Sequence, residues 1–310
     1  MIEGKGGIKA TVVAHSISEA GQEILTYELE YPRFIHAEFM THRQFSRNAA
    51  SSRAIPIEKM IEQVLRDPAK PIHWGKNQAG MKAKEELGFT DKLMCDTMWG
   101  HSSKAASEWA DHLHNKGLHK QATNRILEPY QFIKVVCTAT EYENFFYLRN
   151  HADAQPEIAE LARVMLEARE MSIPVELKVG EWHLPYVSQS WLITSDESVP
   201  PAQNFWSGVA VESDRISLGD AIKISSSLCA QVSYRKADVS IDKALKIYDM
   251  LVNMKPVHAS PFEHQATPMG EGDWTDGVTH VDVGGSFWSG NFKGWIQNRQ
   301  LIKGHVYNGK

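Results

Sequence analysis

The chain has 310 residues, 42% of them hydrophobic and 23% charged, with a formal net charge of -5 at pH 7. At about 150 residues per domain this length predicts a folded protein of two domains, and the acidic balance argues against a general nucleic-acid binder. Three cysteines without a C-x-x-C pair exclude a disulfide framework and a cysteine zinc site: Cys95, Cys137 and Cys229. No signal peptide and no apolar stretch of about 18 residues is present, so we expect a cytoplasmic protein with no membrane partner.

Strands and helices are both predicted along the chain. Residues 9–14 (KATVVA), 24–31 (ILTYELEY) and 279–283 (THVDV) have the composition of strands. Residues 104–127 are predicted to be helical, with a break near Gly117. The fold class is therefore α+β.

Three further helices are predicted with defined starts. One begins at Pro156, a residue favoured at the first helical position, and its apolar face comprises Ile158, Leu161, Ala162 and Met165. The other two begin after Ser217 and Ser240, which can cap the free backbone N–H groups of a first turn. Turn-rich residues 194–203 (TSDESVPPAQ) predict a boundary near residue 200, which divides the chain into parts 1–200 and 201–310.

The segment from Phe39 to Ile57 contains no acidic residue and is rich in hydrogen-bond donors, which are His42, Arg43, Ser46, Arg47, Asn48, Ser51, Ser52 and Arg53. Guanidinium groups, short hydroxyls and backbone N–H groups together suit a phosphate or a pyrimidine carbonyl. A solvated basic face is the alternative. Because small residues allow a ligand to approach closely, we favour an anion site.

Other clusters do not indicate a site. His112, His114 and His119 lack an acidic partner in ligand spacing, so they are interpreted as surface histidines and no metal is predicted. The late glycines match neither dinucleotide-binding nor phosphate-loop patterns, which excludes a Rossmann-type flavin site.

Residues 41–53 (THRQFSRNAASSR) closely resemble the signature of flavin-dependent thymidylate synthases (the ThyX type). That signature is Arg-His-Arg, a serine seven residues later and an arginine two beyond; His42, Arg43, Ser51 and Arg53 match it. Residues 124–129 (NRILEP), then 144–149 (NFFYLR) leading into 154–158 (AQPEI), resemble further family segments in the expected chain order.

Two C-terminal segments resemble parts that the family carries before its Arg-His-Arg motif. They are residues 229–234 (CAQVSY) and 258–264 (HASPFEH). The order is thus permuted, by a circular permutation of the coding sequence or by a duplication that kept different motifs in each half. The resemblance implies a ThyX-like fold of mixed helices and antiparallel sheet, with a second ThyX-like part at the C-terminus.

The resemblance also implies ligands: FAD, dUMP, methylenetetrahydrofolate and NADPH. It implies a homotetramer with sites at subunit interfaces, or a dimer if each chain carries two ThyX-like parts. By the same resemblance, dUMP is bound by Glu38, Ser51, Ser52, Arg53 and Arg125, with Arg53 and Arg125 also catalytic. FAD is bound by His42, Arg43, Asn144, Arg149, Ser233, His258 and Ser260.

Each of these roles has a plainer alternative. Arg125 could be a helix-end cation, Asn144 and Arg149 an exposed polar stripe, and His258 a turn residue. The chain also departs from the family at four positions, which are Glu38, Thr41, Ala49 and Asp153. Thr41 replaces the first arginine of the triplet, and Arg47 and Arg299 are candidates to compensate for it.

Three functions follow from these observations. The first is an FAD-dependent thymidylate synthase, favoured because the chain lacks the Pro-Cys-His nucleophile of ordinary thymidylate synthases. The second transfers hydroxymethyl, or uses another pyrimidine nucleotide, and is motivated by Thr41 and Ala49. The third is a non-catalytic nucleotide- or flavin-binding homologue.

Overall fold

The computed structural model describes residues 1–80, 83–187, 216–232, 240–270 and 274–307. Its main sheet has six strands in the order β1-β2-β3-β5-β4, with β6 beside β2. The strands are β1 (Ile2–Glu3), β2 (Lys9–Ser18), β3 (Glu23–Pro32), β4 (Ser46–Ala49), β5 (Phe132–Ala139) and β6 (Val175–Leu177). All pairs are antiparallel except β2 with β6.

The two strands expected near the N-terminus are confirmed as β2 and β3, each ten residues long. Strand β5 was not predicted, although it pairs with β3 and with β4. From Val135 to Ala139 its side chains are buried on both faces. A strand covered on both sides lacks the alternation of apolar and polar residues that a one-sided strand shows.

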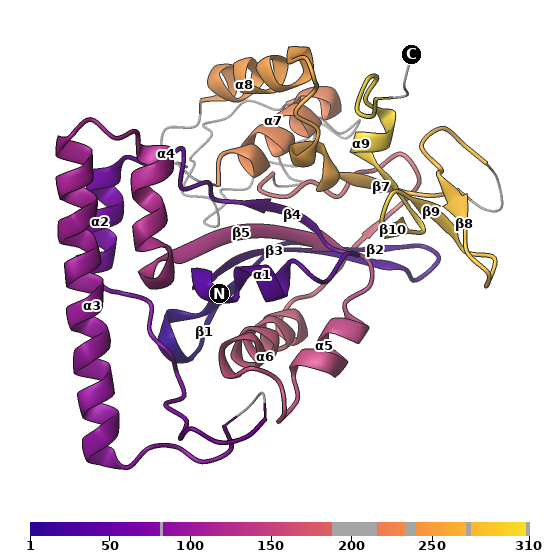
Figure 1. Ribbon diagram of the computed structural model, residues 1–310. Coiled ribbons are helices and arrows are strands. Elements are labelled where there is room, and N and C mark those ends of the chain that lie inside the picture. Colours follow the sequence, from indigo (N-terminus) through magenta and orange to yellow (C-terminus); the bar gives the residue numbers. More distant parts are fainter. Residues whose placement is uncertain (81–82, 188–215, 233–239, 271–273, 308–310) are drawn as a thin grey trace.

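One face of the sheet packs against helix α6 (Pro156–Glu170), on the same side as α1 (His36–Phe39) and α5 (Glu143–Arg149) (Figure 1). The predicted start and apolar face of α6 are confirmed, since Ile158, Leu161, Ala162 and Met165 are fully buried. They join the inward residues of β3, such as Leu25 and Leu29, in the largest hydrophobic core.

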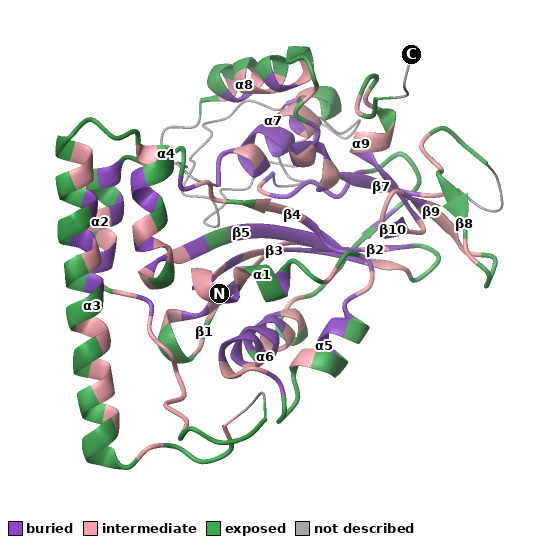
Figure 2. Ribbon diagram, in the orientation of Figure 1, coloured by how far each residue is buried: buried purple, intermediate pink, exposed green. Residues whose placement is uncertain are grey.

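The opposite face is covered by C-terminal elements: α7 (Leu218–Ala230), α8 (Ile241–Asn253) and the 3-10 helix η5 (Ser260–Glu263) (Figure 1). Both predicted caps are confirmed, because the hydroxyl of Ser217 accepts from the N–H of Asp220 and that of Ser240 from the N–H of Lys243. The sheet is thus the middle of three layers, and its central strands are buried (Figure 2).

Helices α2 (Ile57–Arg66), α3 (Phe89–Asn115) and α4 (Lys120–Thr123) and the 3-10 helix η3 (Asn124–Tyr130) lie at one end of the sheet (Figure 1). The predicted break at Gly117 is confirmed, with φ at +85°. The predicted start at Lys104 is wrong, because α3 begins at Phe89. No residue of α3 before Ser103 is buried, so this half lacks the periodic apolar face that sequence analysis detects (Figure 2).

The other end carries short strands: β7 (Ala266–Pro268), β8 (His280–Val281), β9 (Phe287–Ser289), β10 (Phe292–Lys293) and β11 (Trp295–Gln297), followed by α9 (Asn298–Leu301). The strand expected over 279–283 is reduced to β8. The boundary proposed near residue 200 lies outside the described residues. Residues from both sides of it share one core, since Ile24 and Leu177 pack with Ala266, Phe292 and Trp295.

None of the helices in the described ranges is both long and apolar enough to cross a membrane.

Candidate active site

The loop after α1 carries the family-like residues His42 and Arg43, and Arg47 holds its shape. The Arg47 guanidinium donates from Nη1 to the carbonyls of Met40 (3.0 Å) and His42 (2.9 Å). The carbonyl groups at the end of a helix have no partners within the helix, and Met40 and His42 lie just after the end of α1. The Thr41 hydroxyl donates to the Glu38 carbonyl (2.7 Å). The Arg47 guanidinium group is therefore already hydrogen-bonded within the loop. This weighs against the suggested role of Arg47 as a substitute for the arginine that Thr41 replaces.

His42 contacts Arg149, 107 positions away in the sequence. Arg149 Nε donates to His42 Nε2 at 3.0 Å. The imidazole also packs edge-on against Phe145 at 4.8 Å between ring centres. Burial, and then the charges of Arg149 and Arg47, lower the pKa of His42 to about 4. At neutral pH the ring is uncharged, and because Nε2 accepts, its proton is on Nδ1, where it can be donated.

The structure thus brings two of the predicted FAD residues together and places two others nearby. Arg43 directly follows His42 and is exposed, and Asn144 is exposed on α5, the helix that ends at Arg149. The packing of His42 on Phe145 ties the loop to the same helix. The exposure of Asn144 agrees with both predictions made for it, a contact with FAD and an exposed polar stripe.

Two segments that carry predicted nucleotide residues are hydrogen-bonded to each other. The Asn124 amide donates from Nδ2 to the carbonyls of Ser52 (2.6 Å) and Ile55 (3.1 Å), so the turn at 51–55 is fastened to the start of η3. Arg53 follows Ser52 and Arg125 follows Asn124, and both side chains are exposed. Two exposed arginines from distant segments therefore directly follow the residues of one hydrogen-bonded junction.

Two charged residues near this junction escaped sequence analysis. Glu128 Oε1 lies 2.8 Å from Arg125 Nη1 and 3.0 Å from Arg33 Nη2. The spacing of Arg125 and Glu128 could have suggested one ion pair, since residues three apart share a helix face. Nothing in the sequence connects Arg33 with them. Glu38, also predicted for the nucleotide, is exposed on α1.

The C-terminal segments lie against the strand that follows the His42 loop. Asn48 of β4 donates from Nδ2 to the Cys229 carbonyl (3.2 Å). Asn291 donates from Nδ2 to the Gln44 carbonyl (2.7 Å) and accepts at Oδ1 from Gln297 Nε2 (2.9 Å). Gln297 Nε2 also lies 3.3 Å from the Glu263 carbonyl, to which it donates. Cys229 and Glu263, which belong to the two C-terminal segments, are thus connected through hydrogen bonds to the N-terminal motif.

Within the segment 258–264, the two histidines differ in environment. His264 is fully buried and shares a hydrogen bond with Thr138 Oγ1 of β5 through Nδ1 (2.8 Å). His258 is exposed and Ser260 half-buried, while Glu263 forms an ion pair with Arg299. Arg299 is therefore already engaged. Ser233 lies outside the described residues.

We expect stability to fall as the pH is lowered, because burial lowers the pKa of His183 and of His264 to about 3. In the unfolded chain these groups bind protons below pH of about 6.5, so acid favours unfolding through the window from about 6.5 to about 3. Between pH 7.5 and 5 each histidine should cost about 2 kcal/mol of unfolding free energy. Urea unfolding at both pH values measures this loss, and an unchanged free energy of unfolding would contradict it.

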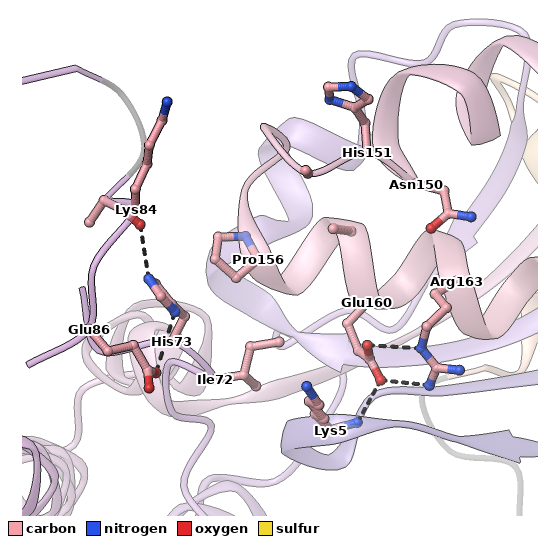
Figure 3. Close-up of a pocket in the computed structure, with 13 residues that line it drawn as sticks. Lys5, Ile72, His73, Lys84, Glu86, Asn150, His151, Pro156, Glu160 and Arg163 are labelled. Atoms are coloured by element: carbon pink, nitrogen blue, oxygen red, sulfur yellow. Dashed lines mark hydrogen bonds and ion pairs between the residues drawn. The ribbon is translucent and has the colours of Figure 1, made fainter. Parts of the chain in front are cut away.

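A separate pocket of about 650 Å³ lies between residues 72–73 and 83–86 on one side and α6 on the other (Figure 3). Asn150 and His151, which follow Arg149, line one wall, but none of the predicted site residues lines it. Arg163 in this pocket donates to both carboxylate oxygens of Glu160 (Figure 3). The cation that α6 contributes to the pocket, Arg163, is thus paired with a carboxylate of the same helix.

The cysteines and histidines do not form further sites in the described residues. None of Cys95, Cys137 and Cys229 forms a disulfide, and burial raises the pKa of the Cys137 thiol to about 12, so it stays protonated. Among the side chains that the structure describes, no group of three or more His, Cys, Asp or Glu could hold a metal ion.

The profile of the family described as thymidylate synthase complementing protein matches residues 13–175, more than half of the chain. The chain belongs to this family. Residues 42–53, 124–129 and 144–158 all fall inside the matched range, whereas the segments at 229–234 and 258–264 lie beyond it. No curated protein sequence matches the chain.

Solved structures of one protein are similar over part of the chain. The UMP/dUMP methylase PolB from Streptomyces cacaoi, bound with 5-Br UMP, gives a TM-score of 0.42 at 16% identity and covers 55% of this chain and 92% of its own. The same protein bound with 5-Br dUMP gives a TM-score of 0.41 at 16% identity, over 54% of this chain and 92% of its own.

Proposed function

We propose that the protein is an FAD-dependent thymidylate synthase, which methylates dUMP reductively to dTMP with methylenetetrahydrofolate and NADPH. The observation that carries this proposal is the junction of Asn124 with the turn at 51–55, because Arg53 and Arg125 directly follow Ser52 and Asn124, which are hydrogen-bonded to each other there. Membership of the thymidylate synthase complementing protein family supports it.

Arg53 and Arg125 bind the nucleotide in this proposal, together with Ser51, Ser52 and Glu38. Guanidinium groups form charge-assisted hydrogen bonds to phosphate and carbonyl oxygens, and they stabilise negative charge that develops on a pyrimidine ring. No cysteine nucleophile is required, which agrees with the protonated, buried state of Cys137.

The donor set around His42 fits FAD. Neutral His42 offers Nδ1–H, and Arg43 offers an exposed guanidinium, so diphosphate oxygens and flavin carbonyls both find donors. Arg149 orients the imidazole through Nε2. FAD, when bound, supplies the hydride. Asn144, Ser233, His258 and Ser260 complete the proposed set of FAD residues, and the closeness of 258–264 to β4 supports including that segment.

A hydroxymethyl-transferring enzyme is the second candidate, because Thr41 and Ala49 depart from the family pattern. The two candidates differ in product mass. A non-catalytic binding homologue is the third, and the retention of His42, Arg43, Ser51 and Arg53 argues against it.

The test of the function is flavin content followed by product analysis. We expect the purified protein to release FAD on denaturation, or to bind FAD when it is added, and to perturb the flavin spectrum with dUMP. With methylenetetrahydrofolate and NADPH, mass spectrometry should find dTMP. A hydroxymethylated product would favour the second candidate, binding without turnover the third, and absence of flavin binding would exclude the flavin enzymes.

We also propose a homo-oligomer acting in the cytoplasm. Exposed apolar side chains on α3, including Met94, Met98 and Trp109, support an assembly with further copies of the chain. The absence of a disulfide among the three cysteines supports a reducing compartment. Sedimentation velocity distinguishes a tetramer from a dimer.

A further inference from the structure

One carboxylate oxygen near the nucleotide residues is shared by two arginines. Glu128 Oε1 lies 3.0 Å from Arg33 Nη2 and 2.8 Å from Arg125 Nη1. The side chain of Arg33 is 18% exposed and that of Glu128 27%, whereas that of Arg125 is 57% exposed. Arg33 is therefore built into the protein, and Arg125 is the surface partner that can turn away.

The backbone supports this division of roles. The N–H of Arg33 donates to the carbonyl of Gln131 (2.8 Å), the residue that follows η3 in the chain. This hydrogen bond attaches the segment of Arg33 to the end of η3. Burial, and then the Arg33 charge, lower the pKa of the neighbouring His36 to about 4. His36 is thus neutral at pH 7, and Arg33 and Arg125 are the cations paired with the Glu128 carboxylate among the residues that the structure describes.

We propose that Arg33 is a positioning residue for nucleotide binding, which keeps Glu128 paired when Arg125 leaves that carboxylate to bind dUMP. This inference rests on the proposed function. A partly buried carboxylate without a partner is unfavourable, so breaking a lone Arg125–Glu128 pair would oppose binding. With Arg33 in place, the Glu128 carboxylate keeps a positively charged partner. Arg125 then leaves Glu128 to bind dUMP at little cost in free energy.

The test is a double-mutant cycle on dUMP affinity, measured by titration calorimetry on the full-length protein. Arg33→Gln should weaken dUMP binding about tenfold, because Glu128 then depends on Arg125 alone. Glu128→Gln should bind dUMP at least as tightly as the wild type. The double variant should recover the affinity of Glu128→Gln, which a loss of folding caused by the Arg33 change would not do.

Lys70→Gln is the matched control, since it breaks the comparable Lys70–Asp96 pair (2.9 Å) elsewhere and should leave dUMP affinity unchanged. If Arg33→Gln does not fold, Arg33→Lys is used, and its affinity should lie closer to the wild type than that of Arg125→Ala. Unchanged binding in Arg33→Gln, or a double variant as weak as Arg33→Gln, overturns the inference while the proposed function stands. A wild-type protein that binds no dUMP overturns both.

Discussion

Replacing His264 by alanine will lower the free energy of unfolding by about 3 kcal/mol, the scale of a buried large-to-small change. His264 is fully buried, and its Nδ1 is 2.8 Å from Thr138 Oγ1 in the middle of the main sheet. Thr138 in turn shares a hydrogen bond with Thr26 (2.7 Å). The substitution therefore removes one of the hydrogen bonds that link the C-terminal segment to the central strands.

Urea unfolding followed by circular dichroism measures this loss as a lower transition midpoint at an unchanged slope. His258→Ala is the matched control, because it lies in the same segment and its side chain is exposed. It should change unfolding by less than about 0.5 kcal/mol, and under the proposed function it should weaken FAD binding. Equal effects of the two substitutions on stability would contradict the layered packing described above.

Removing Arg53 and Arg125 will weaken dUMP binding most strongly among the substitutions considered. Each arginine should supply a charge-assisted contact, so Arg53→Ala and Arg125→Ala should each lower the affinity about 10- to 100-fold. Both side chains are exposed, and Arg125 makes a surface ion pair with Glu128, so folding should be unaffected.

Titration calorimetry with dUMP measures both affinities, with thermal unfolding as the check on folding. Lys59→Ala serves as control, since this exposed cation lies on α2 close in sequence to the turn at 51–55. It should change the affinity less than about twofold, as expected for a screened surface charge. Wild-type affinity in both arginine variants would mean that the nucleotide binds elsewhere.

Local sequence patterns predicted several elements because their causes are local. The start of α6 at Pro156 and the serine caps of α7 and α8 depend on residues within one turn of each other. The missed strand β5 and the missed first half of α3 show the limit of the same patterns. Strand β5 is largely buried on both faces, whereas the part of α3 before Ser103 is buried on neither face. In both segments the sequence therefore lacks the periodic change between apolar and polar residues that reveals a strand or a helix.

The amino-acid sequence by itself determined which residue types are available: the donor-rich segment from Phe39 to Ile57, the family motifs and the absence of a cysteine nucleophile in its usual context. Only the tertiary structure decided which of them meet. Strand β5 pairs at Cys137 with Tyr27 of β3 and with Arg47 of β4. That register packs the C-terminal segment on the sheet through Thr138, and packing likewise brings Arg149 to His42 and Arg33 to Glu128. Contacts over such separations follow from strand pairing and packing, which no local pattern encodes.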